Sequence, residues 1–113
     1  MWLVEDDNYA LFGNHGEDAT IPISAYLPER SFYIGGISKS LAPGLRLGFL
    51  VCPPGPSFDS IVQAIRATVY SPSALGGLLF AQWVEDGSAF KIAKSVTEEI
   101  GRRLVLARTM LGL

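Results

Sequence analysis

The chain has 113 residues, of which 49% are apolar and 18% charged, and its formal net charge at pH 7 is −2. Its nine Lys and Arg residues are scattered and form no basic helix face, so the composition gives no sign of a nucleic-acid-binding surface. No apolar run reaches the roughly 20 residues of a membrane helix, and no signal peptide opens the chain. We therefore expect a cytoplasmic protein, with no membrane contact and no direct nucleic-acid contact by this segment.

Three apolar segments predict strands. Residues 2–4 end in the acidic triplet 5–7, a second segment spans residues 31–34, and a third spans residues 46–52 before a proline-rich stop. Continuous apolar runs are typical of strands that are buried on both faces, in an α/β sheet covered by helices. Between the first two segments, residues 13–30 are rich in turn formers and predict a surface connection, with a helical turn near residues 23–26.

The rest of the chain has a helical pattern. Ser57 is the expected N-cap of a first helix, and Ser71 is the expected N-cap of a second, with Pro72 at its first position. From about Ser88 an apolar stripe at helical spacing predicts one long helix that runs to Leu113 without a capping glycine or a cationic last turn.

The loop at residues 35–48 concentrates the chemistry. It carries the Lys39 amine, hydroxyl groups and the Arg46 guanidinium next to an apolar strand, where an unpaired charge is costly. A phosphorylated aldehyde would satisfy this set, because Lys39 could form a Schiff base with its carbonyl while Ser38 and Arg46 held its phosphate. Asp6 and Lys39 each follow a predicted strand, so they could share one crevice at the carboxyl ends of the strands.

These residues resemble a known family. The run VEDDNY at residues 4–9, then Ser38-Lys39, then LAPGLRLG at residues 41–48 look like the pyridoxal-phosphate site of fold-type I, class I/II aminotransferases. The resemblance implies a fold in which this chain is part of the transferase large domain, a mostly parallel sheet with covering helices. Residues 1–87 would be the C-terminal half of that domain, and residues 88–113 a long helix leading toward a small domain.

The resemblance also implies a role for each matching residue. Asp6 would pair with the pyridine nitrogen of pyridoxal 5′-phosphate, and Tyr9 would bind the phenolic oxygen of its ring. Lys39 would be the catalytic residue that forms the Schiff base, while Ser38 and Arg46 would hold the phosphate. A carboxylate at the ring nitrogen keeps that nitrogen protonated, and a guanidinium matches phosphate geometry. No metal site is expected, because His15 is the only histidine and has no paired cysteines.

This chain departs from the family in two ways. Gly36 stands where the family usually has a Ser or Thr that contacts the phosphate. The phosphate cradle and the stacking ring that the family places before the Asp6 position are absent, so we expect this chain to be inactive alone and the cofactor to be weakly held. An open sheet edge leads us to expect a homo-oligomer.

Three functional hypotheses remain open, including whether the parent protein is an enzyme at all. The main one is a fragment of an aminotransferase that moves an amino group between an amino acid and a 2-oxo acid. The second is the pyridoxal-phosphate-binding effector module of a bacterial GntR/MocR-type transcriptional regulator, because residues 41–49 resemble that group too. The third is a non-catalytic, self-associating fragment.

Overall fold

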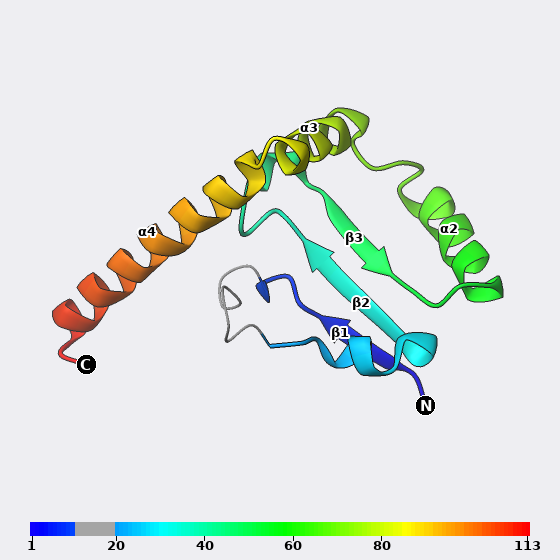
Figure 1. Cartoon of the computed structure of the whole chain (residues 1–113), viewed down its shortest axis with the longest axis horizontal. Helices are drawn as coiled ribbons and strands as arrows, with labels where there is room; N and C mark the ends of the chain where they lie inside the picture. Colours follow the sequence, from blue (N-terminus) through cyan, green and yellow to red (C-terminus); the bar gives the residue numbers. More distant parts are fainter. Residues whose placement is uncertain (11–19) are drawn as a thin grey trace.

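The computed structural model describes residues 1–10 and 20–113. Its sheet has three strands in the order β1 (Leu3–Asp6), β2 (Ser31–Gly36) and β3 (Gly48–Val51). The three strands lie close to the predicted segments, although β1 and β2 run about two residues further and β3 is shorter. Figure 1 shows β2 between its two neighbours.

The two strand pairs have opposite directions. β1 pairs with β2 in parallel, from Leu3 opposite Ser31 to Asp6 opposite Ile34. β2 pairs with β3 antiparallel, ending with Gly36 opposite Gly48. Parallel strands need a crossover of about a dozen residues or more, usually a helix, and the short loop at residues 37–47 turns the chain straight back instead. This part of the sheet is therefore mixed rather than mostly parallel.

Short 3₁₀ turns connect the strands: η1 (Ile23–Tyr26), η2 (Pro28–Arg30) and η3 (Pro43–Leu45). The first confirms the predicted turn. Its amino end is fixed to β1, because the backbone N–H groups of Ile23 and Ser24 donate to the Glu5 carboxylate at 3.1 and 2.8 Å. These bonds, the Ser24 backbone bond foremost, lower the pKa of Glu5 below its usual value.

Three helices follow the sheet: α2 (Pro56–Thr68), α3 (Ala74–Glu85) and α4 (Ser88–Leu111). The predicted helical pattern is confirmed, but the caps are not. Gly55 precedes α2 without a side-chain cap, so Ser57 lies inside the helix. The cap of α3 is Ser73, whose hydroxyl accepts from the Gly76 N–H at 3.1 Å, while the Ser71 hydroxyl donates to the Pro72 carbonyl.

The end of α4 also differs from the prediction. Gly112 adopts a left-handed conformation with φ of 70°, and its N–H donates to the Arg108 carbonyl. Arg108 itself lies in the last turn, where a cation favours the helix dipole. The helix was expected to end at Leu113 without a capping glycine or a cation in its last turn. It ends at Leu111 instead, so it has both.

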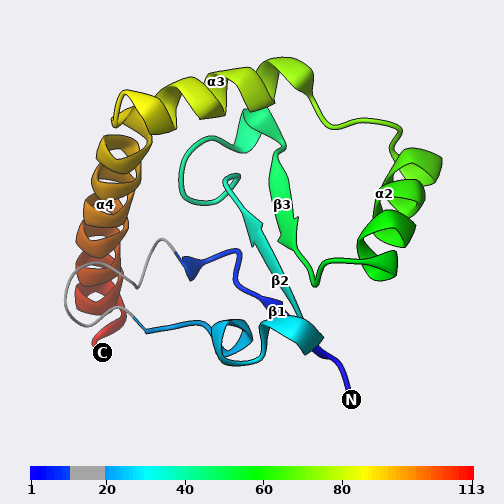
Figure 2. The ribbon, with the colours of Figure 1, turned by 45° about the vertical axis from the view of Figure 1, so that its right-hand side comes forward.

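The helices lie around the sheet rather than over both of its faces. Figure 1 shows α3 across one end of the sheet, α2 beyond β3, and α4 leading away from the strands. Figure 2 shows α2 and α4 on opposite sides of the strands and α3 across one end, with the C-terminus at the far end of α4. The molecule extends over 52 × 35 × 27 Å. Within the described ranges, no helix is long and apolar enough to cross a membrane.

The buried apolar core is small. Among the described residues it consists of Ile37, Ala89 and Ala93, which line one cavity between the loop after β2 and the start of α4. All residues of β3 are exposed, and β1 alternates between half-buried and exposed positions. This corrects the expectation that the strands are buried on both faces. Burial on two faces requires a helical layer on each, and the described helices lie mainly at the ends and sides.

Candidate functional site

Asp6 is the last residue of β1 and lies at the end of the sheet where β1 and β2 have their carboxyl ends, which we call the carboxyl-end edge. The backbone beyond it is fixed, because the Asp7 N–H donates to the Ile34 carbonyl of β2 at 2.9 Å. The Asp6 side chain is exposed, and its Oδ1 accepts two hydrogen bonds from Asn8, at 2.7 Å from Nδ2 and 3.3 Å from the backbone N–H. The carboxylate is thus accessible at the sheet edge and held by one of its two oxygens.

Lys39 lies in a compact loop that joins β2 to β3. The Ile37 N–H donates to the Leu47 carbonyl at 3.2 Å, and the Ile37 carbonyl accepts from Leu41 and Ala42 at 2.9 and 3.1 Å. Ile37 is only 1% exposed and anchors this loop in the core. The anchored turn leaves Lys39 exposed next to it.

Arg46 has an unusual backbone conformation. Its φ of 50° and ψ of 40° place it in the left-handed region at the end of η3, although it is not glycine. A side chain in this region costs on the order of 1 kcal/mol or more, and such residues cluster at functional sites. The loop therefore holds a guanidinium-bearing residue at a position where glycine would fit with less strain.

The topology places these three groups at one edge of the sheet. Asp6 lies at the carboxyl end of β1, and Lys39 follows the carboxyl end of β2, its parallel neighbour. Because β3 is antiparallel to β2, its beginning lies at the same edge, and Arg46 comes two residues before it. Their roles in binding stay predictions.

The other two predicted residues lie near this edge. Ser38 is half-buried and precedes Lys39, and Tyr9 lies in the turn after β1 and is 63% exposed. The predicted His15 loop lies outside the described residues.

The donor set fits an anionic aldehyde. Within residues 1–10 and 20–113, neither Lys39 nor Arg46 forms an ion pair; the salt bridges found there join Glu99 to Arg102 and Arg103 on α4. The Oγ atoms of Ser40 in this loop and of Ser31 at the start of β2 are both buried without a hydrogen-bond partner in the described part of the chain, so this feature is not confined to the candidate site. An amine, a guanidinium and hydroxyls are groups that could bind a phosphorylated aldehyde, and such binding stays a prediction.

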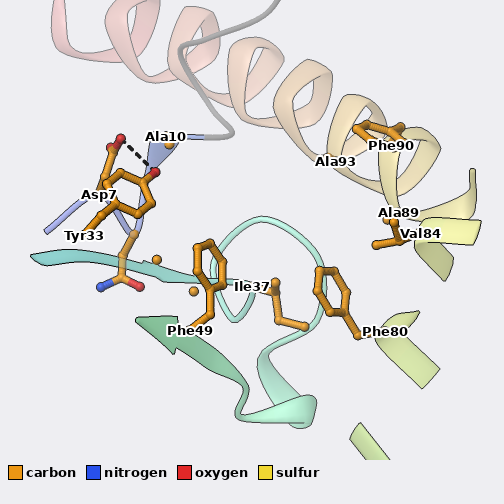
Figure 3. A pocket seen from close by; sticks show the side chains of 13 residues that line it. Asp7, Ala10, Tyr33, Ile37, Phe49, Phe80, Val84, Ala89, Phe90 and Ala93 are labelled. Carbon is orange, nitrogen blue, oxygen red and sulfur yellow. Dashed lines mark hydrogen bonds between the residues drawn. The ribbon is translucent and has the colours of Figure 1, made fainter. Parts of the chain in front are cut away.

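Sequence reasoning missed a pair of residues beside this edge. The Tyr33 hydroxyl donates to the Asp7 Oδ2 at 3.2 Å, at one end of an apolar cavity of about 220 Å³. Figure 3 shows this pair with Phe49 nearby and Ala93 of α4 across the cavity. Burial, and then the Asp7 charge, raise the pKa of Tyr33 above its ordinary value. This pair could have been predicted only from the alignment of residues 5–7 with the second strand. That alignment depends on the register between the two strands, which the sequence does not show.

The comparisons with known proteins identify regulators. No known family model matches the chain. It is 33% identical over 79 residues to an uncharacterized HTH-type transcriptional regulator, YdfD, of Bacillus subtilis, and 30% identical over 86 residues to the probable rhizopine catabolism regulatory protein MocR of Rhizobium meliloti. These matches cover 70% and 76% of this chain. A third, HTH-type transcriptional regulator TauR of Rhodobacter capsulatus, is 55% identical over 40 residues, which are 35% of this chain.

The chain is much shorter than these relatives. It spans 16% of the length of YdfD, 17% of MocR and 8% of TauR. The homologues are thus HTH-type transcriptional regulators, and this chain matches a limited part of each.

These names correct two of our expectations. None of the relatives found is named as an aminotransferase, so the expected aminotransferase name is wrong for them. Their names favour our second hypothesis, a module of a transcriptional regulator, over the main one, an enzyme that acts on an amino acid and a 2-oxo acid. The expectation of no direct nucleic-acid contact by this segment is also contradicted, because the relatives are named as regulators, most of them as HTH-type transcriptional regulators, a class that binds DNA. It failed because charge and composition were read over one segment, whereas the relatives are several times longer.

Proposed function

We propose that this chain is part of the effector module of a transcriptional regulator, and that the module holds pyridoxal 5′-phosphate at the carboxyl-end edge of the sheet. The observation that carries the regulatory function is the similarity to regulators over 70% or more of the chain. The support for the cofactor is that Asp6, Lys39 and Arg46 all lie at the same end of the sheet. A lysine that was merely solvated in a loop would not need an acid and a guanidinium at that end.

Each residue has a definite task in this proposal. When bound, the cofactor supplies an aldehyde that reacts reversibly with primary amines. The Lys39 amine is the group of this chain that would hold it covalently. Ser38 and Arg46 would donate hydrogen bonds to its phosphate, and a guanidinium can do so with two parallel bonds. The Asp6 carboxylate would keep a proton on the ring nitrogen, and the Tyr9 phenol would donate to the ring oxygen.

This arrangement gives the regulator a way to sense a small amino compound. The amine of such a compound would compete with the Lys39 amine for the same site. The signal would be the change between Lys39 bound to the cofactor and Lys39 released from it. Lys39 lies in an anchored loop that also carries Arg46. A ligand can shift the regulator only through such a difference between two states.

The full-length protein tests this function on DNA from upstream of its own gene. Its affinity for that DNA is measured by fluorescence anisotropy with and without pyridoxal phosphate, and then with a panel of small primary amines. Lys39→Ala should abolish the response to cofactor and amines. Lys94→Ala on α4 is the matched control and should respond like the wild type. A wild-type protein whose DNA binding ignores the cofactor, or an equal response in Lys39→Ala, would refute the proposal.

A further inference from the structure

Asn8 contacts the Asp6 carboxylate more closely than any other described residue does. Its Nδ2 donates to Asp6 Oδ1 at 2.7 Å, and its backbone N–H donates to the same oxygen at 3.3 Å. The other carboxylate oxygen, Oδ2, has no hydrogen-bond partner within residues 1–10 and 20–113. The contact therefore fixes the orientation of the carboxylate and leaves one oxygen available.

The Asn8 carboxamide occupies the space that a side chain at position 36 would need. A Cβ placed on Gly36 would collide with Asn8 Oδ1, at a separation that real Cβ atoms do not adopt. Gly36 is otherwise an ordinary strand residue at the end of β2, without a positive φ that would call for glycine. A side chain at this position would therefore displace the end of the Asn8 side chain before it met any other described atom.

We propose that Asn8 is a positioning residue for the Asp6 carboxylate and that Gly36 is the position that makes room for it. The inference rests on the proposed cofactor site, in which the free oxygen of Asp6 would face the ring nitrogen. Carboxylates held by a fixed donor present one orientation, which limits the entropy lost when a ligand binds.

The coupling between the two positions can be measured without cofactor. Gly36→Ala should lower the thermal midpoint of the protein only slightly, because the added Cβ meets the flexible end of the Asn8 side chain and pushes its carboxamide away from Asp6. In the Asn8→Ala background the same change should cost much less. Gly44→Ala is the control, since an added Cβ there has no atom within 4 Å. Equal losses for Gly36→Ala in both backgrounds would overturn the coupling.

The effect on the proposed site is read from the absorbance of bound pyridoxal phosphate, titrated over concentration and pH. Asn8→Ala should weaken binding about tenfold, the usual scale for one charge-assisted hydrogen bond, and should change the pH dependence of the absorbance. Asn8→Asp keeps the shape but cannot donate, so it should also weaken binding. A residue that only supports the fold would lower stability and leave the pH profile unmoved.

The possible outcomes separate this inference from the proposed function. If the wild type binds cofactor on Lys39 and both Asn8 variants bind it with unchanged affinity and pH profile, the positioning role is wrong while the proposed function stands. If the wild type binds no cofactor at Lys39, the proposed function is wrong and the positioning role falls with it. Weakened binding in both variants, with the Gly36 coupling, supports the inference.

Discussion

Two residues of the described chain carry a side chain in the left-handed region. Arg46 has φ of 50° and Tyr70 has φ of 62°. Tyr70 lies in the connection before α3 and is 85% exposed, far along the chain from the candidate site. Arg46 lies in the loop that carries Lys39. The same local strain thus occurs once in a plain connection and once beside the group proposed to bind phosphate, and the two can be compared directly.

Replacing Arg46 by glycine should therefore have opposite effects on stability and on binding. Arg46→Gly relieves the left-handed strain and should raise the free energy of unfolding by up to about 1 kcal/mol, less whatever the extra freedom of glycine costs in the unfolded chain. It should also weaken the binding of pyridoxal phosphate, since the guanidinium is lost. Urea unfolding and cofactor titration measure the two effects.

Tyr70→Gly is the control for the Arg46 substitution. It should gain similar stability and leave cofactor binding unchanged. If Arg46→Gly bound the cofactor as tightly as the wild type, the guanidinium would have no part in the site.

The Tyr33 hydroxyl predicts a dependence of stability on alkaline pH. Burial and Asp7 raise its pKa above the ordinary 10.0, so the neutral phenol stabilises the folded state. That contribution is complete below about pH 10 and is lost as the pH rises through the raised pKa. Tyr33→Phe should show a smaller loss of stability between about pH 8 and about pH 11 than the wild type. An identical alkaline loss in both proteins would mean that the phenol titrates as it does in water.

At this scale the sequence indicated some residues and not others. Asp6 and Lys39 could be named because each lies shortly after a predicted apolar strand, within runs that resemble a pyridoxal-phosphate site. The Asp7–Tyr33 bond could not, since it depends on which residues of two separate strands lie side by side. The Asn8–Gly36 contact was hidden for the same reason: the glycine appeared only as a missing hydroxyl.

The stability of α3 depends on its N-cap, Ser73. Ser73→Ala removes the hydroxyl that accepts from the Gly76 N–H and should cost about 1 kcal/mol of stability. Ser71→Ala removes a hydroxyl that bonds only the neighbouring Pro72 carbonyl and should change stability by less than about 0.5 kcal/mol. Chemical denaturation of the two variants compares them. A larger loss in Ser71→Ala would restore the cap that the sequence pattern favoured.

Helices and strands could be predicted as elements, but their ends and directions could not. Apolar spacing alone indicated α2, α3 and α4, because burial of one helix face repeats at every turn. Two serines lie within three residues before α3, and only the backbone conformation decides that Ser73 is the cap. The antiparallel direction of β3 depends on how the loop at residues 37–47 folds, and the pattern of apolar runs does not show that.

The whole molecule is an open arrangement with a small buried core. Ile37 joins the carboxyl-end edge to the core, and the loop it anchors carries Lys39 and Arg46. The apolar residues of β3, Phe49 among them, are exposed, so composition correctly predicted apolar strands and wrongly predicted their burial within the described part of the chain. The class of the homologues was found by comparison with whole regulators, since their DNA-binding character is not visible in this segment's charge.

The most direct test asks whether pyridoxal phosphate chooses Lys39. Residues 1–113 contain three lysines, Lys39, Lys91 and Lys94, and Lys39 is far enough along the chain from the other two for peptide mapping to tell an adduct on it from one on them. The full-length protein is mixed with an equimolar amount of pyridoxal phosphate, reduced with borohydride and mapped by peptide mass spectrometry. We predict one adduct on Lys39 that disappears in Lys39→Ala and is weakened in Arg46→Gly. No adduct, or a label spread evenly over the three lysines, would contradict a cofactor site at this edge of the sheet.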